Sequence, residues 1–452
     1  MDNASKIKDF ILSNEQEEAI RVFNDKKNMM LTGPGGSGKT ALIKKMVKIC
    51  KDEKREVQVC ALTGCAAVLL ECHAKTIHSW SGIGLANGPS DLIVKRVVTN
   101  KKKSSNWKKV DTLIIDEVSM MSQKVFEILD SIGRQVNKGR SHLPFGGIHI
   151  IFSGDFYQLP PVSQSNWLES DDYDASASAF CFESPSWEST FSTVIQLKKI
   201  FRQTDEEYTN ILNKIRVGKL NKSSFDVLCK HVNKSLPETF IPTILLPRRR
   251  DVELINMSEL LKLNGEERKY KLERIKTLPT EVISIMQSEY LSEEQRENEY
   301  NYMEGNIMAE KMIVLKIGTQ VMCVANIDTE SEMPLVNGSQ GVIVKFVGDL
   351  PCVRFNNGYT RIIPYHTWTS EKNNSIGIKQ IPLIYAWAIT IHKSQGVSLD
   401  MAQIDAGNNI FECGQTYVAL SRIKSLNGLY LTAFDPQKIK VNKKVQEFYS
   451  KL

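Results

Sequence analysis

The sequence predicts an α/β fold built around a nucleotide-binding loop, and three observations support this prediction. Residues 33–40 read GPGGSGKT, which fits the phosphate-binding pattern G-x-x-x-x-G-K-[ST]. An apolar strand pattern at 28–32 leads into this loop, and a helix pattern at 41–49 leads out of it. Short apolar runs then alternate with helix patterns as far as residue 195, which is typical of a parallel sheet covered on both faces.

The loop supplies the groups that a nucleotide requires. Its glycines allow the tight turn that aims backbone N–H groups at phosphate oxygens, and the following helix start adds partial positive charge. Lys39 is expected to reach the β- and γ-phosphates, and the Thr40 hydroxyl is expected to bind Mg²⁺. The predicted nucleotide contacts are Gly33, Pro34, Gly35, Gly36, Ser37, Gly38, Lys39, Thr40 and Ala41.

Two polar strand ends downstream complete the catalytic set. The apolar run 112–115 ends in Asp116 and Glu117. In a P-loop ATPase, Asp116 would hold the Mg²⁺ shell, and Glu117 would orient and deprotonate the attacking water. The run 149–152 leads to Gln158, which is placed to sense the γ-phosphate or the attacking water.

Weaker signals surround these motifs in the first domain. Gln16 lies one helix length before the loop, and its amide has the donor and acceptor needed to pair with adenine. Residues 95–109 are basic and polar, which predicts an exposed insertion or loop tip. The expected strands after the loop are 57–62, 112–115, 149–152 and 193–197.

The second half of the chain has a different organisation. A second α/β pattern opens near Thr243 and resumes at Leu383. Between them, residues 281–310 are acidic and helix-prone, and residues 312–365 predict a small inserted β-barrel with Asn-Gly hairpin turns. The expected strands of this insertion are 312–315, 320–324, 341–346, 352–355 and 361–364.

Bulk properties restrict the class of protein. A chain of 452 residues suggests roughly three domains, and 42% hydrophobic with 24% charged residues is ordinary for a globular protein. The net charge of +6 fits an anionic partner without requiring one. Nine cysteines without a C-x-x-C pair indicate neither a zinc site nor a disulfide framework. With no signal peptide or membrane span in the sequence, we expect a cytoplasmic or nuclear protein, or a viral or phage protein in a host cell, and no membrane partner.

Nine segments, in order, carry a resemblance to a known family. They are LSNEQEEAI, GPGGSGKT, ALTGCAAVLL, TIHSWSGIG, LIIDEVSMM, FSGDFYQLPPV, LKKIFRQ, AWAITIHKSQGVSLD and YVALSRIKSLNGL. Together they resemble superfamily-1 (subfamily B) DNA helicases of the RecD/Pif branch from residue 12 to about 430, and TIHSWSGIG points to the Pif family. Two positions depart from the family pattern: Leu62 stands where proline is usual, and Ser398 stands where threonine is usual.

The resemblance implies two RecA-like P-loop domains with ATP between them. The first domain would carry a small wedge insertion, and the second would carry the small β-barrel insertion. The implied boundaries are 1–195 for the first domain with a wedge at about 78–110, 196–267 and 379–452 for the second, and 268–378 for the inserted domain with its barrel at about 312–365.

The resemblance also implies roles for individual residues. Gln16 would read adenine, Gly396 would couple the nucleotide to DNA, and Arg202 and Arg422 would reach the phosphates from the opposite wall of the cleft. Such an arginine can contribute about 10³–10⁵ in rate. The implied DNA contacts use hydroxyl and cationic groups for phosphates and rings for base stacking, with core packing an equal alternative for Phe156. They are Thr63, His78, Phe156, His392, Lys393 and Ser394.

The predicted activity is ATP- and Mg²⁺-dependent DNA unwinding, and the resemblance implies 5′-to-3′ movement on single-stranded DNA. Expected partners are single-stranded DNA and forked or 5′-tailed duplex, bound by a monomer, in replication, recombination or repair. Three alternatives stay open. They are a DNA-stimulated translocase without strong unwinding, an RNA-directed helicase of the same superfamily, and a P-loop kinase or ATPase that does not use nucleic acid.

Overall fold

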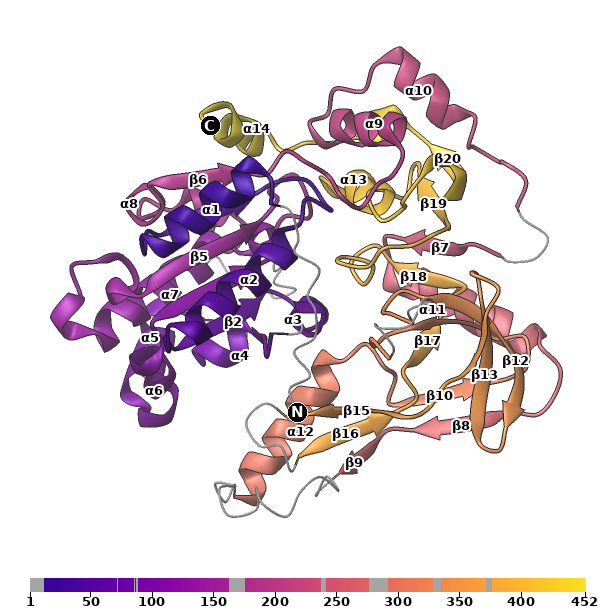
Figure 1. Cartoon of the computed structure of the whole chain (residues 1–452), viewed down its shortest axis with the longest axis horizontal. Helices are drawn as coiled ribbons and strands as arrows, with labels where there is room; N and C mark the ends of the chain where they lie inside the picture. The colour runs from indigo at the N-terminus through magenta and orange to yellow at the C-terminus, as the bar shows by residue number, and fades with distance from the viewer. Residues whose placement is uncertain are drawn as a thin grey trace. The chain divides into compact units, whose positions relative to one another are not determined.

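The computed structural model describes residues 12–452 apart from 71, 85, 87, 162–174, 237–240, 276–291, 328–334 and 371–375. The chain forms two compact units (Figure 1). Unit 1 comprises Met1–Arg202 and Asn442–Leu452, and unit 2 comprises Gln203–Val441. Within the described residues, no helix is both long enough and apolar enough to cross a membrane.

Unit 1 is built on a parallel six-stranded sheet in the order β3-β2-β4-β5-β1-β6. The predicted strands of this unit are confirmed, because each apolar run lies in the sheet. Every residue of the three central strands is buried, which explains their continuous apolar character. The strands are β1 (Met29–Thr32), β2 (Val57–Ala61), β3 (Lys75–Thr76), β4 (Thr112–Asp116), β5 (His149–Gly154) and β6 (Thr193–Gln196).

Helices cover both faces of this sheet. On one face Leu31 and Ile114 share a core with Leu42 of α2. On the other face Phe152 of β5 packs against Phe126 of α7, with 5.9 Å between ring centroids. The helices of unit 1 are α1 (Asn14–Asn24), α2 (Lys39–Asp52), α3 (Gly64–Leu70), α4 (Ile77–Ser81), α5 (Ser90–Thr99), α6 (Lys101–Lys109), α7 (Gln123–Val136), α8 (Trp187–Thr190) and α14 (Lys443–Ser450).

The basic stretch 95–109 is not the exposed loop tip that its composition predicted. It lies in α5 and α6, and Asn100 caps α6 by accepting hydrogen bonds from two backbone N–H groups. Trp107 is fully buried, with its ring centroid 4.9 Å from that of Trp80. Most lysines of α6 lie on its exposed face, while Trp107 lies on the buried face. The strongly basic composition therefore concealed a single apolar position.

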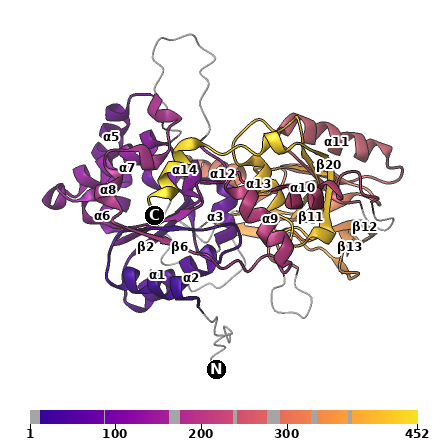
Figure 2. The same ribbon diagram turned by 90° about the horizontal axis from the view of Figure 1, so that it is seen from above.

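The end of the chain also differs from the prediction. We expected residues 379–452 to belong entirely to the second domain, but Asn442–Leu452 groups with unit 1. In Figure 2 α14, drawn in yellow, lies among the indigo and magenta elements of unit 1. Phe448 stacks on Phe182 at 4.7 Å, and Tyr449 stacks on Tyr157 at 4.6 Å, which accounts for this placement.

Unit 2 contains a second parallel sheet, in the order β18-β7-β19-β20. It uses the apolar run that opens at Thr243 and the later part of the run that begins at Leu383, whose first residues form β17 of the inserted region. Its strands are β7 (Thr243–Leu246), β18 (Ala388–Thr390), β19 (Ala402–Ala406) and β20 (Leu429–Phe434), and its helices are α9 (Glu206–Arg216), α10 (Lys222–Cys229), α11 (Arg249–Lys262) and α13 (Gln415–Leu420).

An antiparallel β region is inserted into unit 2. Its five predicted strands are all present, and Gly338 and Gly358 adopt φ of 93° and 84° as the Asn-Gly turns require. Sheets β14-β13-β12-β11-β17 and β10-β8 share one apolar core, while β15-β16-β9 forms a third sheet. The strands are β8 (Arg268–Lys271), β9 (Glu273–Ile275), β10 (Met312–Leu315), β11 (Gln320–Cys323), β12 (Gln340–Val347), β13 (Leu350–Phe355), β14 (Thr360–Ile362), β15 (His366–Thr369), β16 (Gly377–Gln380) and β17 (Leu383–Tyr385).

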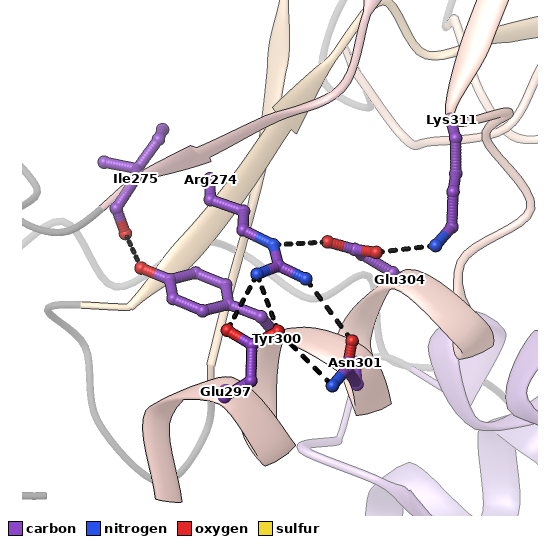
Figure 3. A network of polar contacts seen from close by, with 7 residues as sticks. All are labelled: Arg274, Ile275, Glu297, Tyr300, Asn301, Glu304 and Lys311. Atoms are coloured by element: carbon purple, nitrogen blue, oxygen red, sulfur yellow. Dashed lines mark hydrogen bonds and ion pairs between the residues drawn. The ribbon is translucent and has the colours of Figure 1, made fainter. Parts of the chain in front are cut away.

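The acidic segment 281–310 is partly explained by α12 (Glu293–Asn306), while residues 281–291 lie outside the described residues. Figure 3 shows Arg274 of β9 between two carboxylates of this helix. Its Nε donates to Glu304 at 2.6 Å and its Nη1 donates to Glu297 at 2.9 Å. The hydrogen bond to Glu304 raises the pKa of Arg274. These ion pairs join two acidic residues of α12 to Arg274 of β9.

Candidate nucleotide site and nucleic-acid contacts

The phosphate-binding loop connects β1 to α2 as its sequence predicted. Gly36 and Gly38 have φ of 85° and 86°, a region that favours glycine, and Gly38 precedes the first turn of α2. Lys39 Nζ donates to the backbone carbonyls of Gly33 at 2.7 Å and Pro34 at 3.0 Å. The lysine is therefore folded over its own loop, where a phosphate would approach.

Asp116 and Glu117 stand at the carboxyl end of β4, which lies between β2 and β5 in the sheet. Asp116 is 7% exposed, and burial raises the pKa of its carboxyl despite opposing effects from Ser153, the Glu117 backbone and the charge of Lys39. Glu117 has a left-handed φ of 56°, which is uncommon for a residue with a side chain.

Gln158 follows β5 at the same edge of the sheet. It is 5% exposed, and its backbone N–H donates to the Asp155 carbonyl at 2.8 Å. Its side-chain oxygen is buried without a hydrogen-bond partner among the described residues. An unpaired buried acceptor costs about 1–3 kcal/mol, so it is a group expected to gain a partner in the working site.

Arg202 lies beside the P-loop in unit 1, which corrects two expectations. We expected the second domain to begin at residue 196 and Arg202 to reach the phosphates from the opposite wall. Instead unit 1 continues beyond β6 as far as Arg202, and the Phe201 N–H donates to the Gly36 carbonyl at 2.8 Å. A Cβ built on Gly36 would lie 2.5 Å from the Arg202 Cβ, so the two backbones are in close contact.

Gln16 contacts the loop but is already engaged by the protein. Its Oε1 accepts from the Ser13 N–H at 3.1 Å, and its Nε2 donates to the Ser37 carbonyl at 3.4 Å. Ser13 and Gln16 form a capping box at the start of α1. Ser13-x-x-Gln16 matches the sequence pattern of this cap, a role that we did not consider when we assigned Gln16 to adenine.

The residues assigned to Mg²⁺ fit that ion. Thr40 is exposed at the start of α2, and Asp116 offers a carboxylate at the carboxyl end of β4, in the same sheet as β1. Mg²⁺ prefers oxygen ligands and is commonly held by one or two protein groups together with substrate phosphates and water. A further buried hydroxyl of the loop, Ser37 Oγ, also lacks a hydrogen-bond partner among the described residues.

Unit 2 holds Arg422 in a buried position. The side chain is 1% exposed, and its Nε donates to the Val418 carbonyl at 3.0 Å. Its Nη2 donates to Ser421 Oγ at 2.9 Å. Gly396 lies in an exposed turn with φ of 82°, as glycine allows. Arg422 therefore bonds back to α13, the helix that ends just before it, and is not displayed on the surface of the unit.

Two of the six expected DNA contacts are buried. Phe156 is 1% exposed and packs edge-on against Phe448 at 5.2 Å, which favours the core-packing alternative that the sequence left open for this ring. Ser394 is fully buried, and its hydroxyl donates to the Ile391 carbonyl at 2.8 Å, which removes it as a direct phosphate ligand. Both corrections have one cause, because neighbouring polar residues in each motif concealed a core position.

The other four expected DNA contacts are accessible to different degrees. His392 is exposed, while Lys393 is half-buried with its Nζ 3.8 Å from Glu310. Thr63 is half-buried and uses its hydroxyl to accept from the Ala66 N–H at 3.2 Å. Burial lowers the pKa of His78, which favours its neutral ring. These residues belong to both units, two in each.

The fold and this set of residues define a class: a P-loop ATPase with a second parallel α/β domain and an inserted β region. Comparison with known proteins identifies the family. The PIF1-like helicase profile matches residues 11–225, and the profile of the DNA helicase Pif1 2B domain matches residues 300–346. The second match falls on α12 and the inserted β strands.

Individual relatives agree with these profiles. The chain is 34% identical to the ATP-dependent DNA helicase PIF1 of Danio rerio, over 98% of this chain and 64% of that protein. The crystal structure of Pif1 helicase from Candida albicans is 32% identical, with a TM-score of 0.72, and the match covers 98% of this chain and 99% of that one. Bacteroides sp Pif1 in complex with ADP-AlF4 is 29% identical, with a TM-score of 0.77 over 98% of this chain and 97% of that one.

The chain therefore belongs to the PIF1-like helicase family. The prediction of two RecA-like α/β domains, one carrying an inserted β domain, is confirmed. The chain spans about two thirds of the length of the curated relatives it matches.

Proposed function

We propose that this protein is an ATP-dependent DNA helicase that moves 5′ to 3′ on single-stranded DNA and unwinds duplex. Membership of the PIF1-like family supports the activity. One structural observation carries the ATPase assignment: the P-loop, Asp116, Gln158 and Arg202 all gather at one edge of the unit 1 sheet. Parallel strands place their carboxyl ends together, and ligands of open α/β sheets bind at that edge.

Each residue of this edge has a distinct role in the proposed hydrolysis. Lys39 would exchange its bonds to loop carbonyls for bonds to phosphate oxygens, and Thr40 with Asp116 would hold Mg²⁺. When bound, Mg²⁺ neutralises charge on the β- and γ-phosphates. Glu117 would accept a proton from the attacking water, and Gln158 would orient that water with its unpaired oxygen. Arg202 would stabilise the charge that develops on the transferring phosphoryl group.

Unit 2 would supply the mechanical response to the nucleotide. Arg422 would act on the phosphoryl group after leaving its bonds to α13, and Gly396 would let the adjoining turn move. Gln16 would lie against adenine. His392 and Lys393 in unit 2, and Thr63 and His78 in unit 1, would bind the DNA backbone without sequence preference. Repeated changes in these contacts would move the protein along one strand.

The proposed partners are single-stranded DNA and forked or 5′-tailed duplexes, bound by a monomer. DNA enters this proposal from the named activity of the relatives. The protein would work on DNA in the cytoplasm or nucleus, or on viral DNA in a host cell, in replication, recombination or repair.

The test is ATP hydrolysis with and without single-stranded DNA by the wild type, Lys39→Ala and Lys45→Ala. Lys45 is exposed on the same helix, so its substitution controls for the loss of one positive charge. We expect single-stranded DNA to stimulate hydrolysis by the wild type and Lys45→Ala. Lys39→Ala should lose stimulated hydrolysis while keeping its DNA affinity. Equal hydrolysis by Lys39→Ala would refute the site.

The same assay separates the alternative functions. Stimulation by RNA but not DNA would favour an RNA-directed helicase. No stimulation by either polymer would favour an ATPase that does not use nucleic acid. Stimulation by DNA without separation of a tailed duplex would favour a translocase.

A further inference from the structure

We infer that Tyr449, in the C-terminal helix α14, is a positioning residue of the ATPase site. None of the sequence motifs that define the site includes it. This inference rests on the proposed function, because it concerns the same catalytic edge of unit 1. It is drawn from where the Tyr449 hydroxyl lies and from which residues it joins.

The hydroxyl contacts two strand ends at once. Tyr449 Oη lies 2.6 Å from Thr32 Oγ1, and Thr32 is the last residue of β1 before Gly33 of the P-loop. It also accepts from the Phe156 N–H at 3.2 Å and donates to Asp155 Oδ1 at 3.4 Å. Asp155 and Phe156 begin the turn that leads from β5 to Gln158.

The donors and acceptors of this network are balanced. A phenol has one O–H to donate and can accept two hydrogen bonds. If Tyr449 donates to the Asp155 carboxylate, it can accept from both the Thr32 hydroxyl and the Phe156 N–H. Thr32 and Asp155 are fully buried, and hydrogen bonds are stronger in such surroundings than in water. The arrangement therefore holds the end of β1 and the turn after β5 in one fixed geometry.

Packing of α14 holds the hydroxyl in place. The Tyr449 ring stacks on Tyr157, with centroids 4.6 Å apart and planes at 13°. Phe448 stacks on Phe182 at 4.7 Å and meets Trp187 at 6.1 Å. Val445, one turn earlier, is 1% exposed. These contacts allow removal of the hydroxyl without undocking the helix.

The segment before α14 connects this position to the helix that carries the motif with Arg422. Within unit 2 the Gly414 N–H donates to the Lys440 carbonyl at 3.2 Å, and Thr416 Oγ1 donates to the Lys438 carbonyl at 3.4 Å. Gly414 and Thr416 lie at the start of α13, which ends just before Arg422. Lys440, which contacts the start of α13, precedes Tyr449 by nine positions in the sequence.

Tyr449→Phe tests the inference in the full-length chain, because it removes the hydroxyl and keeps the ring. A net contribution of about 1–1.4 kcal/mol for such a hydrogen bond corresponds to a five- to tenfold effect. We expect kcat for DNA-stimulated hydrolysis to fall roughly five- to tenfold, with KM for ATP and DNA affinity changed by less than about twofold. Tyr359→Phe, which removes a hydroxyl from an exposed hairpin turn, is the matched control and should match the wild type.

A purely structural role would give a different result. In that case Tyr449→Phe would lower the urea midpoint of unfolding while kcat stayed at the wild-type value, and the inference would be overturned. Tyr449→Ala should lose kcat at least as strongly and also lose stability, since the stacked ring is removed. Failure of the proposed function is distinguishable, because the wild type itself would then show no DNA-stimulated hydrolysis.

Discussion

Substitution of Gly36 by alanine should disrupt catalysis through a residue that is 166 positions away in the sequence, Arg202. The new Cβ would lie 2.5 Å from the Arg202 Cβ and 3.3 Å from its backbone nitrogen. Carbon atoms pack at about 3.5–4.0 Å, so the two segments must separate by roughly 1 Å or more. Misplacement of a catalytic group by about 1 Å can cost around 10²-fold in rate. We therefore expect kcat for DNA-stimulated hydrolysis to fall about 100-fold.

The hairpin glycine Gly358 provides the control for backbone strain. Its φ is 84°, against 85° for Gly36, but a Cβ at this position has nothing within 4 Å. Both alanine variants share a conformational cost of about 1–2 kcal/mol, and only Gly36→Ala also moves Arg202. Gly358→Ala should lower the urea midpoint slightly and leave kcat unchanged.

A double-mutant cycle separates the two sides of the P-loop. If Gly36→Ala acts by displacing Arg202, its effect on kcat should nearly vanish in an Arg202→Ala background, because the displaced guanidinium is already absent. If the losses in kcat caused by the two substitutions multiply in the double variant, Gly36→Ala acts on the bound phosphates and not through Arg202. A Gly36→Ala variant with wild-type kcat would refute the reasoning as a whole.

Two further predictions concern stability. Burial lowers the pKa of His149 from 6.5 to about 4. Between these two pH values the unfolded chain binds a proton at His149 and the folded chain does not, so the free energy of unfolding falls as the pH falls. It should be largest above pH 6.5 and lower by up to about 3 kcal/mol towards pH 4. Urea unfolding at pH 7 and pH 5 should show a smaller loss of stability for His149→Gln than for the wild type. Equal losses in the two proteins would contradict this. Trp107→Ala should cost about 3–5 kcal/mol because the ring is fully buried against Trp80, and a change below 1 kcal/mol would show that α6 packs differently.

The catalytic edge was predictable because its signals are local. A parallel strand is buried on both faces, so an apolar run that ends in Asp116 or leads to Gln158 marks a strand end on its own. The P-loop adds a spacing of glycines, lysine and threonine that is specific to phosphate-binding loops. Parallel strands have their carboxyl ends at the same edge of a sheet. The groups that follow these strands are therefore predicted to lie together, even when no long-range contact is known.

The errors came from long-range packing. Phe156 stands among polar residues in its motif, but its surroundings in space are aromatic rings from segments near residues 180 and 448. The apolar positions Val445, Phe448 and Tyr449 predict an amphipathic helix, yet nothing local says that this helix docks on unit 1. Arg202 was assigned to the opposite wall because the sequence does not show that residues 201 and 202 lie against Gly36 of the P-loop.

Unwinding of tailed duplexes tests the central claim most directly. With ATP and Mg²⁺, the protein should separate a duplex with a 5′ single-stranded tail, and it should leave duplexes with a 3′ tail or blunt ends intact. Lys39→Ala should separate none of them. Unwinding that requires a 3′ tail would contradict the proposed direction, and DNA-stimulated hydrolysis without separation of any duplex would contradict the helicase assignment itself.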